Sequence, residues 1–78
     1  MPSQKPFLLY AGCDKQGSKA SYLIIYRQLP HEFILLDGPP ILELAGMREV
    51  RGLKDITRYI ETFQYFLDLE IWKLQHRY

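Results

Sequence analysis

The stretch GCDKQGSK, residues 12–19, comes nearer than any other part of this sequence to a known chemical motif. A phosphate-binding loop reads G-x-x-x-x-G-K-[ST], and its backbone N–H groups and lysine hold the phosphates. The two glycines have that spacing, but the following Ser-Lys pair, residues 18–19, stands in the reverse order. The motif also needs a helix directly after the loop, whereas we expect a strand over residues 20–28. We therefore interpret residues 13–19 as a loop with solvated lysines.

Cys13 is the second candidate for chemistry, as a nucleophile with His31 as its base and Asp14 or Asp37 to orient that base. No local signature surrounds this cysteine, and a chain of this length supplies such residue types by chance. The single Cys and the two His residues do not have the spacing of a zinc site. We therefore expect no enzymatic activity, no catalytic residue, no metal and no cofactor.

A group of basic residues offers a third kind of chemistry, the binding of phosphate groups in nucleic acid. The group lies within the segment REVRGLKDITR and consists of Arg48, Arg51, Lys54 and Arg58. We expect these side chains to lie along one edge, where the last strand runs into a helix. Two acidic residues in the same segment lower the local charge, and strong phosphate binders cluster charge more heavily. A small nucleic-acid-binding or regulatory protein that uses this basic edge is therefore our alternative hypothesis.

The composition indicates one small globular domain over residues 1–78. Apolar residues make up 47% of the chain, charged residues 24% and aromatic residues 14%, and the net charge is +1. These values exclude a disordered chain, and the small charge gives no general attraction to nucleic acid or membrane. No apolar run approaches the roughly 20 residues that span a bilayer. We expect a cytoplasmic protein that does not enter a membrane.

The first two thirds of the chain, residues 6–51, have the pattern of a β-rich region that follows a frayed N-terminus over residues 1–5. We expect strands at the segments PFLLYAG, ASYLIIYRQ and EFILLDG, because β-prone and mostly apolar residues stand there between turn signals. The last two of these strands are joined by few residues, so we expect them to pair antiparallel. The segment 41–51 fits either one helical turn or a hairpin around Ala45-Gly46, and we expect at least one edge strand.

From Gly52 to Arg77 the pattern predicts one long C-terminal helix. A narrow apolar stripe recurs every three or four residues, which is the spacing of one helix face, and contains Leu53, Ile56, Ile60, Phe63, Leu67, Ile71 and Leu74. The predicted fold class is therefore α+β, a small antiparallel sheet of three or four strands packed against this helix. An unbroken helix of that length, about 37 Å, would extend beyond such a sheet.

The second half of this predicted helix is also apolar on the opposite face, at Tyr65, Leu69 and Trp72, with Phe66 between the two faces. A helix that is apolar on every side is normally buried on every side. We therefore expect these four residues to form an interface, either with a second copy of the chain or with another protein. Two alternatives stay open: a break near residues 62–64, or packing of Tyr65 and Trp72 under the N-terminal segment. The resulting hypothesis is a non-enzymatic adaptor or regulatory domain, homodimeric through its C-terminal helix.

Overall fold

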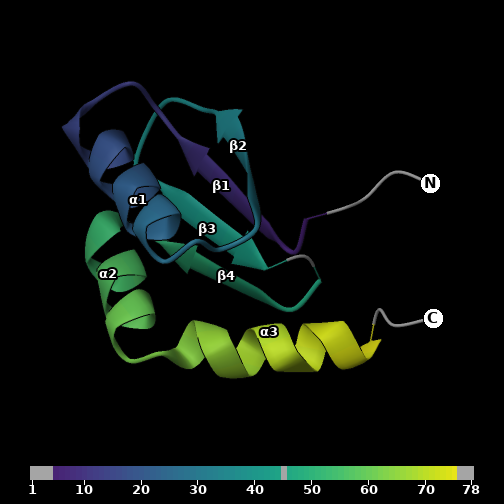
Figure 1. The fold of residues 1–78 in the computed structure, drawn as a ribbon. Coiled ribbons are helices and arrows are strands. Elements are labelled where there is room, and N and C mark those ends of the chain that lie inside the picture. Colours follow the sequence, from purple (N-terminus) through teal and green to yellow (C-terminus); the bar gives the residue numbers. More distant parts are fainter. Residues whose placement is uncertain (1–4, 45, 76–78) are drawn as a thin grey trace.

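The computed structural model describes residues 5–44 and 46–75, which form a four-stranded sheet and three helices (Figure 1). The strands are β1 (Phe7–Ala11), β2 (His31–Leu35), β3 (Ile41–Leu44) and β4 (Arg48–Arg51). The helices are α1 (Lys15–Tyr26), α2 (Leu53–Glu61) and α3 (Gln64–Gln75). The predicted α+β class is confirmed. The prediction of a frayed N-terminus falls mainly on residues 1–4, which lie outside the described residues.

The sheet is mixed, so the prediction of a purely antiparallel sheet is wrong. Its strand order is β2-β1-β3-β4, in which β1 pairs parallel with β2 and antiparallel with β3, and β3 pairs antiparallel with β4. Parallel neighbours need a crossover connection of about a dozen residues or more, which is usually a helix. The segment between β1 and β2 supplies that crossover as α1, which is 12 residues long.

The prediction of a loop over residues 13–19 and a strand over residues 20–28 is therefore also wrong. Asp14 caps α1, because its carboxylate accepts a hydrogen bond of 2.7 Å from the backbone N–H of Gly17. The buried residues of α1 are Gly17, Ala20 and Ile24, and their spacing of three and four is helical. The β-prone residues at the end of α1 conceal this weaker signal, and the need to cross over to β2 overrides their local preference.

The segment 41–51 forms the β3–β4 hairpin, which confirms the expectation of an edge strand there and excludes the alternative of a helical turn. Gly46, which lies between β3 and β4, has a φ of 77°, a conformation that glycine adopts without steric cost. β4 lies at one edge of the sheet and β2 at the other.

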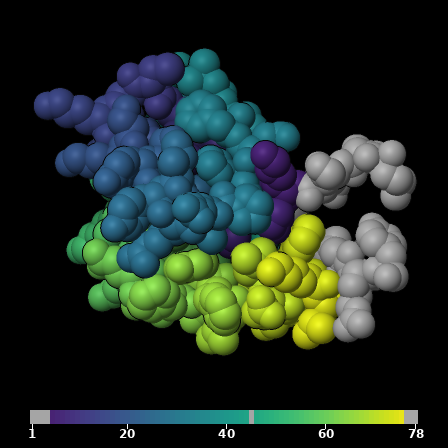
Figure 2. Space-filling model, in the orientation of Figure 1, coloured from purple at the N-terminus to yellow at the C-terminus, as the bar shows by residue number. Residues whose placement is uncertain are grey.

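All three helices pack on one face of the sheet (Figure 1), where one core holds the molecule together. Figure 2 shows the side chains of the three helices forming one continuous outer surface on this side of the molecule. β1 contributes Phe7, Leu9 and Ala11, and the neighbouring strand β3 contributes Leu42 and Leu44 in register with them. The helices contribute Ala20, Ile24, Ile56, Tyr59 and Ile60. The β1, β3 and helix residues named here are at most 6% exposed, so this layer is a packed interior.

The C-terminal helix is broken, which corrects the prediction of one continuous helix over residues 52–77. α2 ends at a C-cap, Thr62, and the next residue, Phe63, has a left-handed backbone with a φ of 60°. The Phe63 N–H donates to the carbonyl of Ile60 at 3.2 Å, as happens where a helix ends in a left-handed residue. The break turns the chain so that α3 runs alongside β4 (Figure 1).

Candidate functional site

The break between α2 and α3 exchanges the inner and outer faces of the C-terminal segment. In α2 the predicted apolar stripe does face the core, through Ile56 and Ile60. Beyond the break the same stripe is exposed, at Phe63 in the turn and at Leu67, Ile71 and Leu74 in α3. The prediction that this stripe packs against the sheet throughout is therefore wrong for its second half.

The four residues predicted as an interface divide between the two sides of α3. Tyr65, Leu69 and Trp72 are half-buried and pack against the chain's own core, as the alternative of burial within one chain would have them. Phe66 is mainly exposed and belongs to the outer side. Their role in an interface stays a prediction, and the geometry now favours the outer side of α3 for it.

A buried carboxylate fixes the inner side of α3. Asp68 is 3% exposed and accepts hydrogen bonds from the hydroxyl of Tyr59 at 2.7 Å and from the amide of Gln64 at 3.2 Å. The Nε atom of Arg48 lies 2.5 Å from the same carboxylate, and its guanidinium lies 5.8 Å from the Tyr59 ring centre. This polar cluster joins α3 to both α2 and β4.

The hydrogen bonds of this cluster hold Asp68 in its ionised form. Burial alone raises the pKa of Asp68, but the hydrogen bonds from Tyr59, Gln64 and Arg48 and the charge of Arg48 together outweigh burial, and the pKa is lowered from its ordinary value. Burial and the hydrogen bond to Asp68 raise the pKa of Tyr59, so its hydroxyl stays protonated. The run FQYFLDLEIWKL contains two acidic residues, Asp68 and Glu70, and nothing in its spacing indicates that only Asp68 is buried.

The structure does not gather the four predicted basic residues into one phosphate-binding edge. Arg48 is paired with Asp68, and Arg51 is paired with its strand neighbour Glu49. Lys54 and Arg58 lie on α2, one helical turn apart, and both are exposed. Two of the four charges are therefore balanced by carboxylates within the chain.

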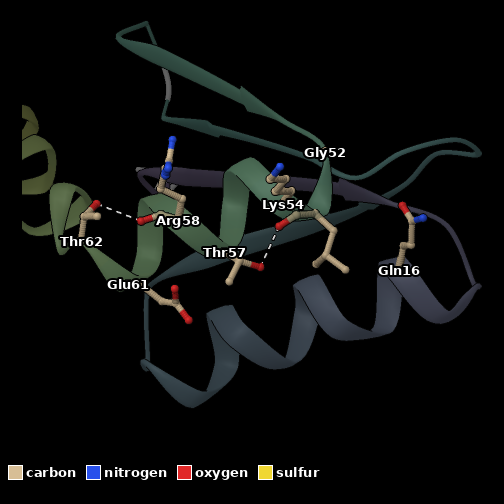
Figure 3. A pocket seen from close by; sticks show the side chains of 8 residues that line it. Gln16, Gly52, Lys54, Thr57, Arg58, Glu61 and Thr62 are labelled. Carbon is tan, nitrogen blue, oxygen red and sulfur yellow. Dashed lines mark hydrogen bonds between the residues drawn. The ribbon is translucent and has the colours of Figure 1, made fainter.

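Lys54 and Arg58 line an open groove of about 780 Å³. Figure 3 shows both side chains extending from the same side of α2, while Thr57 and Glu61 extend toward the side where α1 lies. The groove continues into a smaller apolar hollow between α1 and α2, which Tyr22, Leu23 and Leu53 line. The lining of the groove has mixed charge, since it includes Glu61 as well as the two cations.

Two residues of the chemistry considered around Cys13, Gly17 and His31, make other contacts in the structure. A helix does follow the loop after β1, which removes one of our reasons against a phosphate site, but the Gly17 N–H at its start already binds the Asp14 carboxylate. Gly17 has a packing role there, because a Cβ atom on it would lie 2.1 Å from the carbonyl oxygen of Gly12. His31 hydrogen-bonds the carbonyl of Leu29 at 2.9 Å, not Cys13.

In residues 5–44 and 46–75, no group of three or more His, Cys, Asp or Glu side chains is arranged to hold a metal ion. None of the helices in this part of the chain has the length and apolar character needed to cross a bilayer.

An exposed apolar surface runs from α1 to the outer side of α3, and the sequence reasoning identified only part of it. The rings of Tyr22 and Tyr26 stack at 5.8 Å, and the Arg27 guanidinium lies 6.0 Å from the Tyr26 ring centre and 5.3 Å from that of Phe63. These contacts join the two ends of what we call the apolar helical surface, made of Tyr22, Tyr26, Phe63, Phe66, Leu67, Ile71 and Leu74. These seven residues are 45–67% exposed.

Comparison of the chain with protein-family models, with curated proteins and with solved structures found no match.

Proposed function

We propose that this protein is a non-enzymatic interaction domain that forms a two-fold homodimer through its apolar helical surface. One observation carries the proposal: seven large apolar and aromatic residues lie exposed in a connected series across α1, the α2–α3 turn and α3. Soluble domains rarely leave contiguous apolar patches of more than a few hundred Å² uncovered, and larger patches mark interaction sites.

The size of this surface suits a dimer interface. Roughly half of each side chain is exposed, and a large aromatic side chain has about 200 Å² to bury, so the four aromatic residues alone offer about 400 Å². Leu67, Ile71 and Leu74 add to this area. A standard interface buries about 800 Å² on each partner. Since interfaces of that size range widely in strength, we expect a dissociation constant of about 1 µM or weaker.

The charges on α3 allow two identical copies to meet. Glu70 and Lys73 lie beside the exposed apolar residues and form an ion pair of 3.6 Å within the helix, so this part of the surface has no net charge. Leu67, Ile71 and Leu74 follow one line along α3 at the spacing of packed helices. Antiparallel pairing would place Leu67 of one copy opposite Leu74 of the other, and closed two-fold dimers are the commonest oligomers.

The test is light scattering during size-exclusion chromatography over a hundredfold range of concentration. We expect the wild-type protein to change from monomer to dimer, and the double variant Leu67→Gln with Ile71→Gln to stay monomeric. The matched control is Leu35→Gln with Leu36→Gln, which makes the same chemical change at exposed leucines outside the surface and should leave the dimer intact. A wild-type protein that stays monomeric, or equal effects of the two double variants, would contradict the proposal.

Trp72 supplies an independent readout of which side of α3 is used, because it is the sole tryptophan and lies on the inner side. Dilution through the dimer transition should leave its emission maximum nearly unchanged if the outer side forms the interface. A clear shift on dilution would instead place the interface at Tyr65, Leu69 and Trp72. If the protein stays monomeric and a different protein binds to the same surface, the surface serves that partner and not self-association.

A further inference from the structure

The sheet has a second face on which no helix of the described chain packs. All three helices contact the face that carries Phe7, Leu9 and Ala11, and Figure 1 shows α1 and α2 together on one side of the sheet. Because side chains alternate along a strand, Leu8 and Tyr10 of β1 point to the opposite face, which we call the open sheet face. Its residues fall into two rows that run across the strands.

The first row is acidic. Strand pairing places Glu32 of β2 beside Leu8 of β1, Leu8 beside Glu43 of β3, and Glu43 beside Glu49 of β4. Three carboxylates thus lie in one line; Glu49 is paired with Arg51 of the same strand, whereas Glu32 and Glu43 form no ion pair with any residue that the structure describes. Like charges directly opposite each other destabilise a strand pair, and Glu43 faces Glu49 in this way.

The second row is mainly apolar. It contains Ile34 of β2, Tyr10 of β1 and Ile41 of β3, and it ends at Arg51 of β4. The three residues before Arg51 are half-buried, although no described helix covers them. The Tyr10 hydroxyl donates a hydrogen bond of 3.1 Å to Glu43, which joins the two rows and raises the pKa of Tyr10.

We propose that the open sheet face binds a basic amphipathic helix from another polypeptide, with lysines or arginines along the acidic row and apolar side chains along the adjacent row. Charge complementarity selects this occupant. The two rows together hold three carboxylates and the one guanidinium of Arg51, a net charge of −2, so a second copy that packed its open sheet face on this one would bring two negative faces together. A helix is about 10 Å wide and the rows lie about 7 Å apart, so one helix covers both.

The strand spacing also sets the pattern of the helix. Neighbouring strands lie about 5 Å apart, so Glu49 and Glu43 are separated by about 5 Å, and Glu43 and Glu32, with β1 between them, by about 10 Å. At a rise of 1.5 Å per residue these intervals correspond to about three to four and about seven helical residues. The matching peptide therefore carries basic residues near positions n, n+4 and n+11, which share one stripe, and apolar residues near n+1, n+5 and n+8 on the adjacent stripe.

The probe for the test is a set of labelled 18-residue helical peptides with lysine and leucine at these positions or shifted by one residue, together with lysine-to-glutamate counterparts. Binding is measured by fluorescence anisotropy at low and high salt, and backbone amide shifts locate the contact. We expect the lysine peptides to bind, the glutamate counterparts not to bind, and salt to weaken the complex. The amide shifts should fall on β1, β2, β3 and β4.

A matched pair of triple variants distinguishes binding at the open sheet face from nonspecific attraction between opposite charges. Glu32→Gln, Glu43→Gln and Glu49→Gln together should weaken binding about tenfold, since exposed ion pairs contribute modestly each. The control, Asp55→Asn with Glu61→Gln and Glu70→Gln, makes the same change in net charge on the helical side and should leave binding unchanged. Circular dichroism checks that both variants fold.

The proposal fails if no peptide of the set binds, if both triple variants lose affinity equally, or if the amide shifts fall on the helices. The proposal would also be overturned if, without any peptide, the amide shifts of the open sheet face changed with protein concentration. That result would show that a second copy of the chain binds to this face. These outcomes are separate from those of the dimer test, because the open sheet face and the apolar helical surface share no residue.

Discussion

The two C-terminal helices are neighbours in sequence but differ in how they separate apolar from polar residues. α2 buries Ile56, Tyr59 and Ile60 and exposes charged residues on its other side. In α3 the one fully buried side chain is Asp68, while large apolar residues remain exposed on the outer side. α2 is therefore held by apolar burial, and α3 by a polar cluster with half-buried aromatic and aliphatic residues around it.

The difference shows which apolar residues the fold itself uses. The inner side of α3 already makes the contacts to α2 and β4 that place this helix, through Tyr59, Arg48 and the half-buried residues. The exposed residues of α3 lie on the side of the helix that faces away from these contacts. Burial on association would stabilise a complex and not the fold, and the two helices should therefore respond differently to the same kind of substitution.

Replacement of one apolar residue in each helix should give the largest contrast. Ile60→Ala in α2 removes a side chain that is fully buried, and we expect a loss of about 3–4 kcal/mol in the free energy of unfolding. Leu67→Ala on the outer side of α3 should change that free energy by less than about 0.5 kcal/mol in the monomer. Denaturant unfolding at a concentration below the dimer transition measures both. Similar losses would mean that Leu67 is packed within the chain.

Removal of the buried carboxylate should loosen α3 while α2 stays folded. Asp68→Ala leaves the Tyr59 hydroxyl and the Gln64 amide without their acceptor and deprives Arg48 of its partner, so we expect a loss of about 2–3 kcal/mol. The control on the same helix, Glu70→Ala, breaks an exposed ion pair and should cost less than about 0.5 kcal/mol. Hydrogen exchange should show faster opening of α3 in the Asp68 variant, and unchanged exchange there would contradict the role given to the cluster.

The same residue should make stability depend on pH in acid. Because the folded state lowers the pKa of Asp68, its stabilising contribution is complete above the unfolded pKa of about 3.9 and is lost as the pH falls through the folded pKa. Asp68→Asn lacks this titration. The difference in unfolding free energy between wild type and variant should therefore be largest near neutral pH and shrink below about pH 4, whereas a constant difference would assign the effect to packing.

The sequence predicts the fold class, β1, β2 and an edge strand within residues 41–51, but not α1. The strands have apolar residues between clear turn signals, and such local patterns survive in the structure. α1 ends in β-prone residues, and its buried positions include a glycine and an alanine, which contribute little to an apolar pattern. Its helical form follows from the parallel pairing of β1 with β2, a long-range contact that local spacing does not encode.

The candidate surfaces show the same limit. The second apolar side of the C-terminal segment was evident from residue spacing, but its assignment to Tyr65, Leu69 and Trp72 depended on an unbroken helix. One left-handed residue exchanges the two sides. The ion pair of Arg48 could not be read from a sequence pattern either, because its partner Asp68 lies 20 residues away in the helix that the break repositions.

The helix break itself gives the smallest but most specific prediction. Both α1 and α2 end in a left-handed residue that is not glycine: Gln28, with a φ of 56°, and Phe63, with a φ of 60°. Left-handed backbone costs a residue with a side chain about 1–2 kcal/mol, and glycine avoids that cost but loses more entropy on folding. We therefore expect both Gln28→Gly and Phe63→Gly to raise the free energy of unfolding by about 0.5–1 kcal/mol.

The two glycine variants should differ in their effect on association. Gln28 lies outside the apolar helical surface, whereas Phe63 stands at its centre, next to Arg27. Phe63→Gly should therefore stabilise the monomer and weaken the dimer, and Gln28→Gly should stabilise the monomer alone. Denaturant unfolding and light scattering on the same two variants separate these effects. If Phe63→Gly destabilises the monomer while Gln28→Gly stabilises it, the Phe63 ring contributes to folding. Phe63 would then not belong with the exposed residues of α3 that serve association alone.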